Sequence, residues 1–108
     1  YKIPGAFELP GTVKQVLSYN SPDLVITLGA IIRGETSHFD FVSAECAKGI
    51  RELSMEHNKP IMFGVLTTDN IQQAIERSQK NKQNKGWEVM KAGIETLSTY
   101  KDIQSQSI

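Results

Sequence analysis

The sequence is poor in several features that mark whole classes of proteins. It has one cysteine, Cys46, in 108 residues, which excludes an internal disulfide framework and a metal site made of several cysteines. Its uninterrupted apolar stretches are a few residues long, whereas a membrane-spanning helix needs roughly 20. We therefore expect a soluble protein of a reducing compartment, in the simplest case the cytoplasm.

Charge of one sign is not in excess either. Twelve basic and twelve acidic side chains give a formal net charge of zero, so the overall charge indicates neither nucleic acid nor an anionic membrane as a partner. A chain of this size fits one domain. Because Tyr1-Lys2-Ile3-Pro4 is typical of the end of a strand, we expect residues 1–108 to be a single domain whose N-terminal part lies upstream.

What the sequence does contain is an alternation of helix and strand patterns. Apolar residues recur at helical spacing from Leu9 to Leu17, with Pro10 in the first turn, where proline is tolerated. Residues 24–28 and 61–66 are short β-rich runs bounded by turn residues. Such runs are typical of buried parallel strands.

The stretch after each strand predicts a helix. An apolar stripe from Phe39 to Leu53 predicts one over about residues 38–56. After the second strand, Asp69 and Gln72 resemble a capping pair for a short helix.

The C-terminal quarter predicts one more helix. A polar connector over residues 81–86 leads to a helix from Trp87, with Met90, Ile94 and Leu97 on one face and a polar tail that frays from Lys101. The alternating order predicts an α/β architecture with a parallel sheet covered by helices. Two strands are too few for an independent sheet, so further strands are expected from upstream or from neighbouring chains.

The loop before the second helix carries candidate anion-binding chemistry. Gly34 permits a close backbone approach, and the N–H groups of Glu35, Thr36 and Ser37 would be free donors at the positive end of the helix dipole. Such a cradle suits a phosphate or a carboxylate. The alternative is that Thr36 or Ser37 simply caps the helix while Gly34 makes the turn, and the spacing does not decide between the two.

Two flanking side chains also have open roles. His38 falls in the first helical turn, where the dipole disfavours the imidazolium, so a neutral imidazole there could accept a proton. It could equally be a solvated bystander. Arg33 could bind an anion or serve as a structural ion-pair partner.

Other residues that stand out have ordinary explanations. Phe7 and Phe63 fit a core, Cys46 fits a packed and inert thiol, and His57 fits a helix end without function. The only concentration of basic residues suits a solvated helix end, and it lacks the interleaved aromatics of nucleic-acid sites. It comprises Arg77, Lys80, Lys82 and Lys85.

Three segments nevertheless carry recognisable motifs in a fixed order. The first is Pro4-Gly5-Ala6-Phe7-Glu8-Leu9-Pro10. The second is residues 29–42, with the core Ile-Arg-Gly-x-Thr-x-His-Phe-Asp, and the third is residues 60–77 continuing to Asn84-Lys85-Gly86-Trp87-Glu88. Together they resemble the lumazine synthase family of riboflavin biosynthesis, with a likeness that extends from residue 4 to about residue 98.

The resemblance implies a fold, an assembly and a reaction. The fold would be a three-layer flavodoxin-like α/β domain, assembled into a homopentamer or a pentamer-based shell with active sites between neighbouring subunits. The reaction would condense 5-amino-6-(D-ribitylamino)uracil with 3,4-dihydroxy-2-butanone 4-phosphate to 6,7-dimethyl-8-ribityllumazine, with release of phosphate and water. This chemistry needs no cofactor and no metal.

The resemblance also implies the site residues. His38 would be the catalytic residue, which transfers protons during imine formation and phosphate elimination. The substrate-binding residues would be Gly34, Glu35 and Thr36 at the phosphate; Ala6, Phe7 and Glu8 at the ribityl chain and ring; Ile31 and Ile32 along the pocket; and, from an adjacent subunit, Phe63, Arg77 and, as a weaker candidate, Lys85.

The sequence departs from the family pattern in one respect. Such proteins normally carry an additional N-terminal strand and helix, with an aromatic residue that stacks on the pyrimidine, and neither is in this sequence. Two alternatives stay open, namely a related riboflavin synthase of similar fold and a non-catalytic ligand-binding shell protein. The expected location is the cytoplasm, or a plastid if a transit peptide precedes Tyr1.

Overall fold

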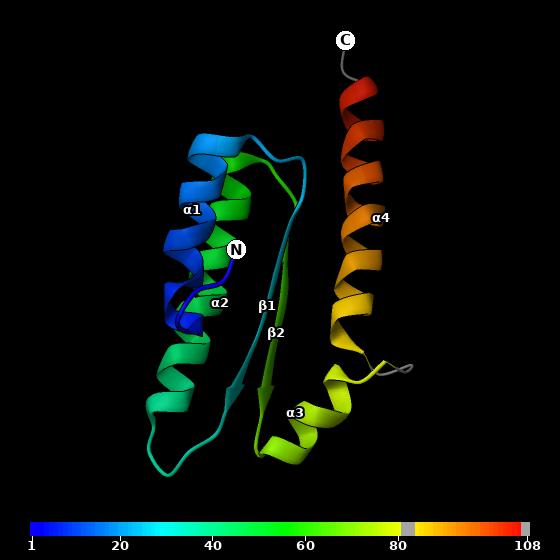
Figure 1. The fold of residues 1–108 in the computed structure, drawn as a ribbon. Coiled ribbons are helices and arrows are strands. Elements are labelled where there is room, and N and C mark those ends of the chain that lie inside the picture. Colours follow the sequence, from blue (N-terminus) through cyan, green and yellow to red (C-terminus); the bar gives the residue numbers. More distant parts are fainter. Residues whose placement is uncertain (81–83, 107–108) are drawn as a thin grey trace.

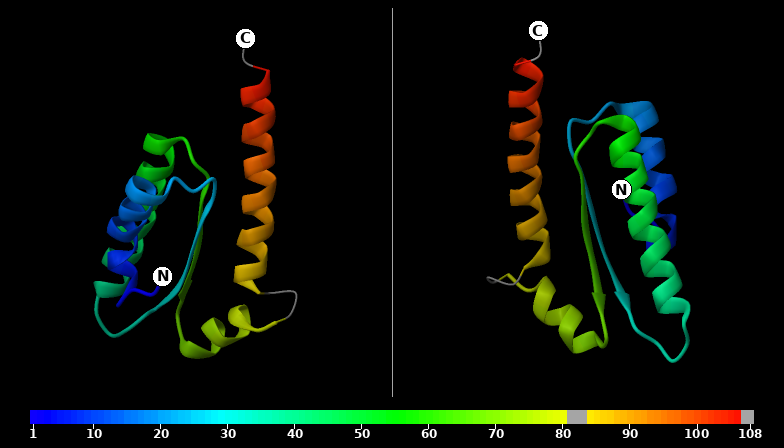
Figure 2. Two further views of the ribbon diagram at one scale, coloured as in Figure 1. Left: turned by 45° about the horizontal axis from the view of Figure 1, so that its top comes forward. Right: turned by 180° about the vertical axis from the view of Figure 1, so that it is seen from behind.

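The computed structural model describes residues 1–80 and 84–106, and these form three layers (Figure 1). A parallel sheet of two strands, β1 (Val25–Ile32) and β2 (Ile61–Thr68), lies in the middle. Figures 1 and 2 show α1 and α2 on one face and α4 on the other, where α4 extends beyond the end of the sheet. The helical elements are η1 (Ala6–Glu8), α1 (Leu9–Asn20), α2 (His38–His57), α3 (Ile71–Ser78) and α4 (Lys85–Ser105).

The predicted α/β class and the parallel pairing are confirmed, but both strands are longer than expected. The register runs without a break from Val25 opposite Ile61 to Ile32 opposite Thr68. Gly29, which looks like a turn residue in the sequence, pairs with Val65 inside the sheet. The loop before α2 therefore begins only after Ile32.

Three local predictions at the ends of elements are wrong. Residues 1–4 form no strand. The cap of α3 is Asn70 rather than Asp69, because Asn70 has extended backbone angles and its side-chain oxygen accepts a hydrogen bond from the N–H of Gln73 at 2.9 Å. The last helix begins at Lys85, two residues before Trp87, with Asn84 as its cap. Of the predicted connector, residues 81–83 lie outside the described part of the chain.

The core lies between the sheet and the helix pair α1 and α2. Apart from half-buried Phe39, the predicted apolar stripe of α2 is buried there, and Cys46 is 1% exposed. Burial raises the pKa of the Cys46 thiol, which favours the inert form expected from the sequence. The buried core cluster consists of Leu9, Val13, Ile31, Val42, Cys46, Ile50, Leu53, Ile61 and Val65.

The opposite face of the sheet is covered differently from the prediction. The helix α4 packs through Val89 and Gly93, and a Cβ at Gly93 would come within 2.9 Å of the Met62 side chain. This close approach turns Met90 and Ile94 outward, where they are 46% and 54% exposed. The face of α4 that covers the sheet is therefore the one with Val89 and Gly93, and Met90 and Ile94 of the predicted apolar face lie outside it. Within the described residues, no helix is long and apolar enough to cross a membrane.

Replacing Gly64 with alanine is expected to lower the free energy of unfolding by about 1–3 kcal/mol, the usual range for overpacked positions. A Cβ at this position would lie 2.5 Å from the Thr27 carbonyl oxygen and 2.9 Å from the Val89 side chain, so β2 or α4 must shift. Denaturant titration followed by circular dichroism measures the change. The control is Gly11→Ala in α1, where nothing lies within 4 Å of the added Cβ. Equal stabilities of the two variants would contradict this packing.

Candidate active site

The end of β1 and the start of α2 enclose a cavity of about 300 Å³, here called the His38 cavity. One wall is apolar, because residues 30–32 of β1 pass along it, and the other is formed by the loop and first turns of α2. The structure thus brings together most of the predicted site residues of this segment. The lining residues are Ala6, Ala30, Ile31, Ile32, Gly34, Thr36, His38, Phe39 and Val42.

A second cavity of about 470 Å³ adjoins the first and shares Ala6, His38 and Val42 with it. The three predicted residues of η1, Ala6, Phe7 and Glu8, line this cavity, because the short helix precedes α1 directly and lies against α2. Phe7 is 55% exposed, so it is not the core residue that its type alone suggests. Its ring stacks on Phe41 with centroids 6.4 Å apart.

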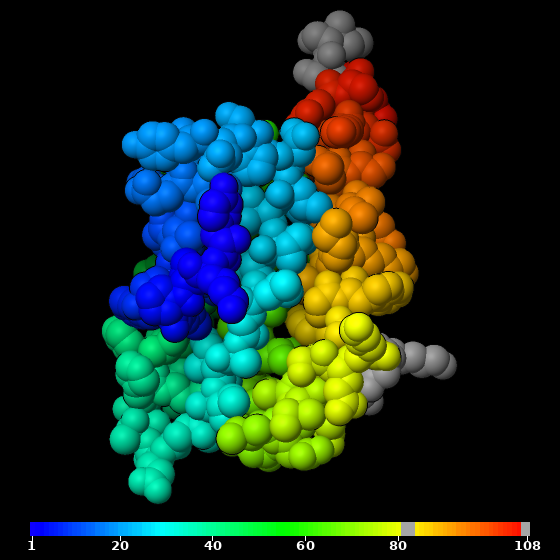
Figure 3. Space-filling model, in the orientation of Figure 1, coloured from blue at the N-terminus to red at the C-terminus, as the bar shows by residue number. Residues whose placement is uncertain are grey.

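The loop between β1 and α2 presents backbone donors to solvent, and it protrudes at one end of the molecule (Figure 3). Ser37 occupies the cap position of α2, but its side chain makes no capping hydrogen bond. The Thr36 hydroxyl accepts a long bond, 3.3 Å, from the N–H of His38. Within the described residues, the N–H groups of Glu35, Thr36 and Ser37 have no acceptor, so the bond between His38 and Thr36 leaves the donors of the predicted cradle available.

The imidazole of His38 faces both cavities and is otherwise unengaged. It lines the His38 cavity together with Thr36, and the adjoining cavity of about 470 Å³ together with Phe7 and Glu8. In the part of the chain that the structure describes, its ring nitrogens take part in no hydrogen bond or ion pair. A group in this position can exchange protons with a ligand that occupies either cavity. Glu35, by contrast, is exposed and lines neither cavity.

Arg33 proves to be an ion-pair partner. Its Nε donates to the Asp69 carboxylate at 2.9 Å, and its Nη1 lies 3.6 Å from the Asp40 carboxylate. Its guanidinium also lies over the Phe39 ring, 4.5 Å from the centroid. Of the two roles that the sequence leaves open, the structural one is therefore observed.

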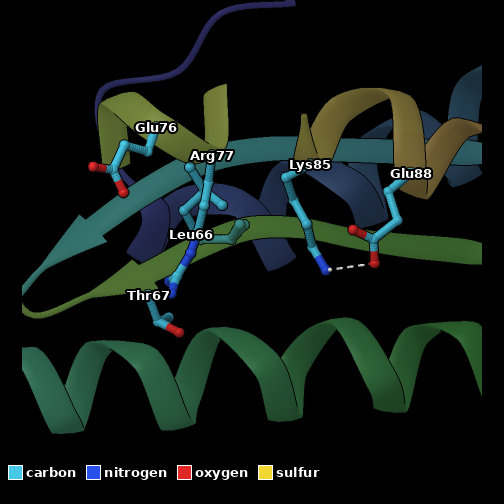
Figure 4. A pocket seen from close by; sticks show the side chains of 7 residues that line it. Leu66, Thr67, Glu76, Arg77, Lys85 and Glu88 are labelled. Atoms are coloured by element: carbon cyan, nitrogen blue, oxygen red, sulfur yellow. Dashed lines mark ion pairs between the residues drawn. The ribbon is translucent and has the colours of Figure 1, made fainter. Parts of the chain in front are cut away.

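The remaining predicted cations lie in a separate cavity of about 690 Å³, here called the Arg77 cavity (Figure 4). Arg77 of α3 and Lys85 of α4 extend across β2 beside Leu66 and Thr67. Lys85 is paired with Glu88 at 3.6 Å, whereas Arg77 has no ion pair among the described residues. Of the two cations that line this cavity, Arg77 is therefore the one that can bind an anion without breaking an ion pair seen among the described residues. Lys82 lies outside the described residues.

The His38 and Arg77 cavities have no lining residue in common. The first takes its strand residues from β1 and the second from β2. Phe63, on β2, is half-buried and packs against the core cluster of its own chain. The chain therefore presents two separate groups of predicted site residues, each along its own strand.

Several lining residues are not among those predicted from the sequence. Phe41 follows His38 by three positions on α2, so the helical spacing that places both on one side was an available signal. Glu76 and Glu88 in the Arg77 cavity, and Ala30 in the His38 cavity, carry no local signal that separates them from ordinary surface residues.

Comparison with known proteins agrees with these features. The model of the 6,7-dimethyl-8-ribityllumazine synthase family matches residues 1–101. The chain is 50% identical over 101 residues to the 6,7-dimethyl-8-ribityllumazine synthase of Sulfurimonas denitrificans, and 50% identical over 103 residues to those of Campylobacter fetus and Chloroherpeton thalassium. These matches cover 94% or 95% of this chain and 66% of each relative, so the chain spans slightly less than two thirds of their length. The chain belongs to the 6,7-dimethyl-8-ribityllumazine synthase family.

Proposed function

We propose that this chain belongs to a transferase that condenses 5-amino-6-(D-ribitylamino)uracil with 3,4-dihydroxy-2-butanone 4-phosphate to 6,7-dimethyl-8-ribityllumazine, in the cytoplasm. Family membership supports the reaction. The observation that carries the assignment of the site is the position of His38, between the free N–H groups of the loop and the residues of η1. The comparisons give no support to the riboflavin synthase or the non-catalytic shell protein.

The loop would hold the phosphate of the four-carbon substrate. The N–H groups of Glu35 and Thr36 and the Thr36 hydroxyl can donate to phosphate oxygens, and the dipole of α2 favours the negative charge. Donors aimed at the departing phosphate stabilise the charge that develops during elimination. No metal is needed for this role, because the donors belong to the backbone and to side chains.

His38 would move the protons that the condensation requires. Imine formation transfers a proton from the attacking amine and delivers one to the departing hydroxyl, and phosphate elimination removes one from carbon. The second substrate would lie against Ala6, Phe7 and Glu8, with its ring along the apolar wall of Ile31 and Ile32. His38 would thus stand between the two substrates.

The site would be completed by a neighbouring subunit in a pentameric ring. The neighbour would contribute Phe63 from β2, Arg77 from α3 and, as a weaker contributor, Lys85 from α4. The His38 cavity, by contrast, takes its strand residues from β1. A cation that cannot reach the phosphate in its own chain can do so in a closed ring, where one surface of each subunit meets a different surface of the next. Arg77 would then contact the phosphate held by the preceding subunit's loop.

The test is to supply the full protein with both substrates and to follow lumazine fluorescence together with phosphate release. Equal molar amounts of the two products are expected. Supplying lumazine alone separates the nearest alternative, since only a riboflavin synthase would then form riboflavin. Assembled protein, verified by sedimentation, that yields neither product would overturn the enzymatic proposal.

Gly34→Ala is expected to raise KM for the butanone phosphate about tenfold without lowering stability. Within the chain, nothing lies within 4 Å of the added Cβ, and the backbone angle φ of Gly34 is not positive, so the fold does not require glycine here. A ligand against the loop would meet the new methyl group, and the loss of one or two hydrogen bonds to a charged group accounts for a change of this size. Steady-state kinetics and thermal unfolding measure both quantities, with Gly11→Ala as the control. An unchanged KM would remove Gly34 from the phosphate site.

A further inference from the structure

The guanidinium of Arg33 joins the two ends of the loop that contains Gly34 and Thr36. Arg33 is the last residue before the loop, and its backbone N–H still belongs to the sheet, where it donates to the Thr68 carbonyl at 2.8 Å. Its side chain contacts Phe39 and Asp40, which follow His38 directly. The Arg33 side chain therefore connects the two ends of the segment from Gly34 to His38.

The same guanidinium reaches the loop after β2. The Asp69 carboxylate accepts from Nε at 2.9 Å, and the N–H of Asp69 donates to the Gln73 side chain in the first turn of α3. A chain of contacts thus leads from the His38 loop to α3, the helix that carries Arg77.

The positive charge of Arg33 is already balanced by neighbouring side chains. Two carboxylates face it, those of Asp40 and Asp69, and an aromatic ring covers one face of its planar group. The hydrogen bond that the guanidinium donates to the Asp69 carboxylate is the main reason that the pKa of Arg33 is raised. An anion that approached Arg33 would have to compete with both carboxylates, so the residue is ill suited to bind phosphate directly.

We infer that Arg33 is a positioning residue, whose pairing with Asp69, Asp40 and Phe39 holds the His38 loop in the geometry that receives the phosphate. The inference rests on the proposed function for its effect on turnover. It adds two residues to that function. Arg33 touches no substrate, and Asp69 is its acidic partner from a distant part of the chain.

The test compares Arg33→Gln, Asp69→Asn and the variant with both changes in the full protein. Each single variant is expected to raise the dissociation constant for inorganic phosphate and KM for the butanone phosphate about tenfold, and the combined variant to be no worse, because residues of one network act together. Hydrogen exchange of peptides that cover residues 33–41 is expected to accelerate in all three, because the hydrogen-bonded N–H groups at the ends of the loop, those of Arg33, His38 and Phe41, lose protection. Arg33→Lys should restore little, since a lysine lacks the planar fork that meets several partners.

The matched control is Arg51→Gln. Arg51 is an exposed arginine of α2 that forms no ion pair within the described residues, and its loss should leave phosphate binding, KM and exchange of the loop unchanged. This control separates an effect of the Arg33 contacts from an effect of net charge on anion affinity.

Two results would overturn the inference. If Asp69→Asn tightens phosphate binding while Arg33→Gln weakens it, Arg33 is a phosphate ligand that Asp69 restrains. If the variants lower only the thermal midpoint, with phosphate affinity and loop exchange unchanged, the contacts serve stability alone. Failure of the proposed function looks different, because the wild-type protein would then form no lumazine while phosphate affinity and loop exchange still responded to the variants.

Discussion

His38→Ala is expected to lower kcat for lumazine formation about 10²-fold, with KM for the butanone phosphate nearly unchanged. A positioned acid or base usually contributes about 10²–10⁴-fold. We expect the low end because, within the described residues, no hydrogen bond fixes the orientation of the His38 imidazole, so its contribution as a positioned group is modest. Lumazine fluorescence at saturating concentrations of both substrates measures kcat.

The matched control for this variant is the other histidine of the chain. His57 is the last residue of α2, at the end opposite the loop, and His57→Ala should keep the wild-type kcat. An unchanged kcat in His38→Ala would remove the proton-transfer role. A loss of phosphate affinity with no loss of kcat would instead make His38 a binding residue.

Much of the fold could be predicted because periodicity reports which side of an element is buried. The stripe of α2 is correctly predicted on that basis, and the strand at residues 61–66 is correctly predicted from its β-rich run between turn residues. The ends of elements were less predictable, since they depend on contacts with distant residues. Gly29 carries a turn signal, yet its pairing with Val65 keeps it in the sheet.

Two features in the last third of the chain that the sequence pattern does not indicate have related causes. Asp69 and Asn70 are both good capping residues, and only the backbone conformation decides that Asn70 caps α3 while Asp69 pairs with Arg33. On α4, the absent side chain of Gly93 lets the helix approach Met62. A pattern of apolar side chains does not indicate a close contact between helix and sheet that depends on a glycine.

The candidate site was predictable in its local part and much less so in its distant part. Residues 34–38 are adjacent in sequence, so their proximity and the helix dipole follow from the order of the elements. That η1 supplies Ala6 and Phe7 to the same region was implied only by resemblance to a family. The contact of Arg33 with Asp69 spans 36 positions, and nothing in the local sequence of either residue indicates it.

Assayed at butanone phosphate concentrations well below KM, mixed assemblies of His38→Ala chains and Arg77→Ala chains are expected to regain about a quarter of wild-type activity, although each variant alone is nearly inactive under these conditions. In one chain the two residues line separate cavities, on β1 and on β2. If each site takes His38 from one subunit and Arg77 from the next, a site is intact when an Arg77→Ala chain precedes a His38→Ala chain. Random mixing places them so at about one interface in four.

Co-expression with two affinity tags, followed by tandem purification, isolates the mixed assemblies for this measurement. Arg77→Ala alone should raise KM for the butanone phosphate by about 10–10²-fold, the range for a lost charged hydrogen bond.

The control mixes His38→Ala chains with chains that carry both substitutions. That mixture must stay inactive, because no subunit then supplies His38. If the first mixture also stays inactive although mass analysis confirms both chains, His38 and Arg77 do not meet across a subunit interface. The separation of the two cavities would then need a different explanation, in which Arg77 serves a site of its own.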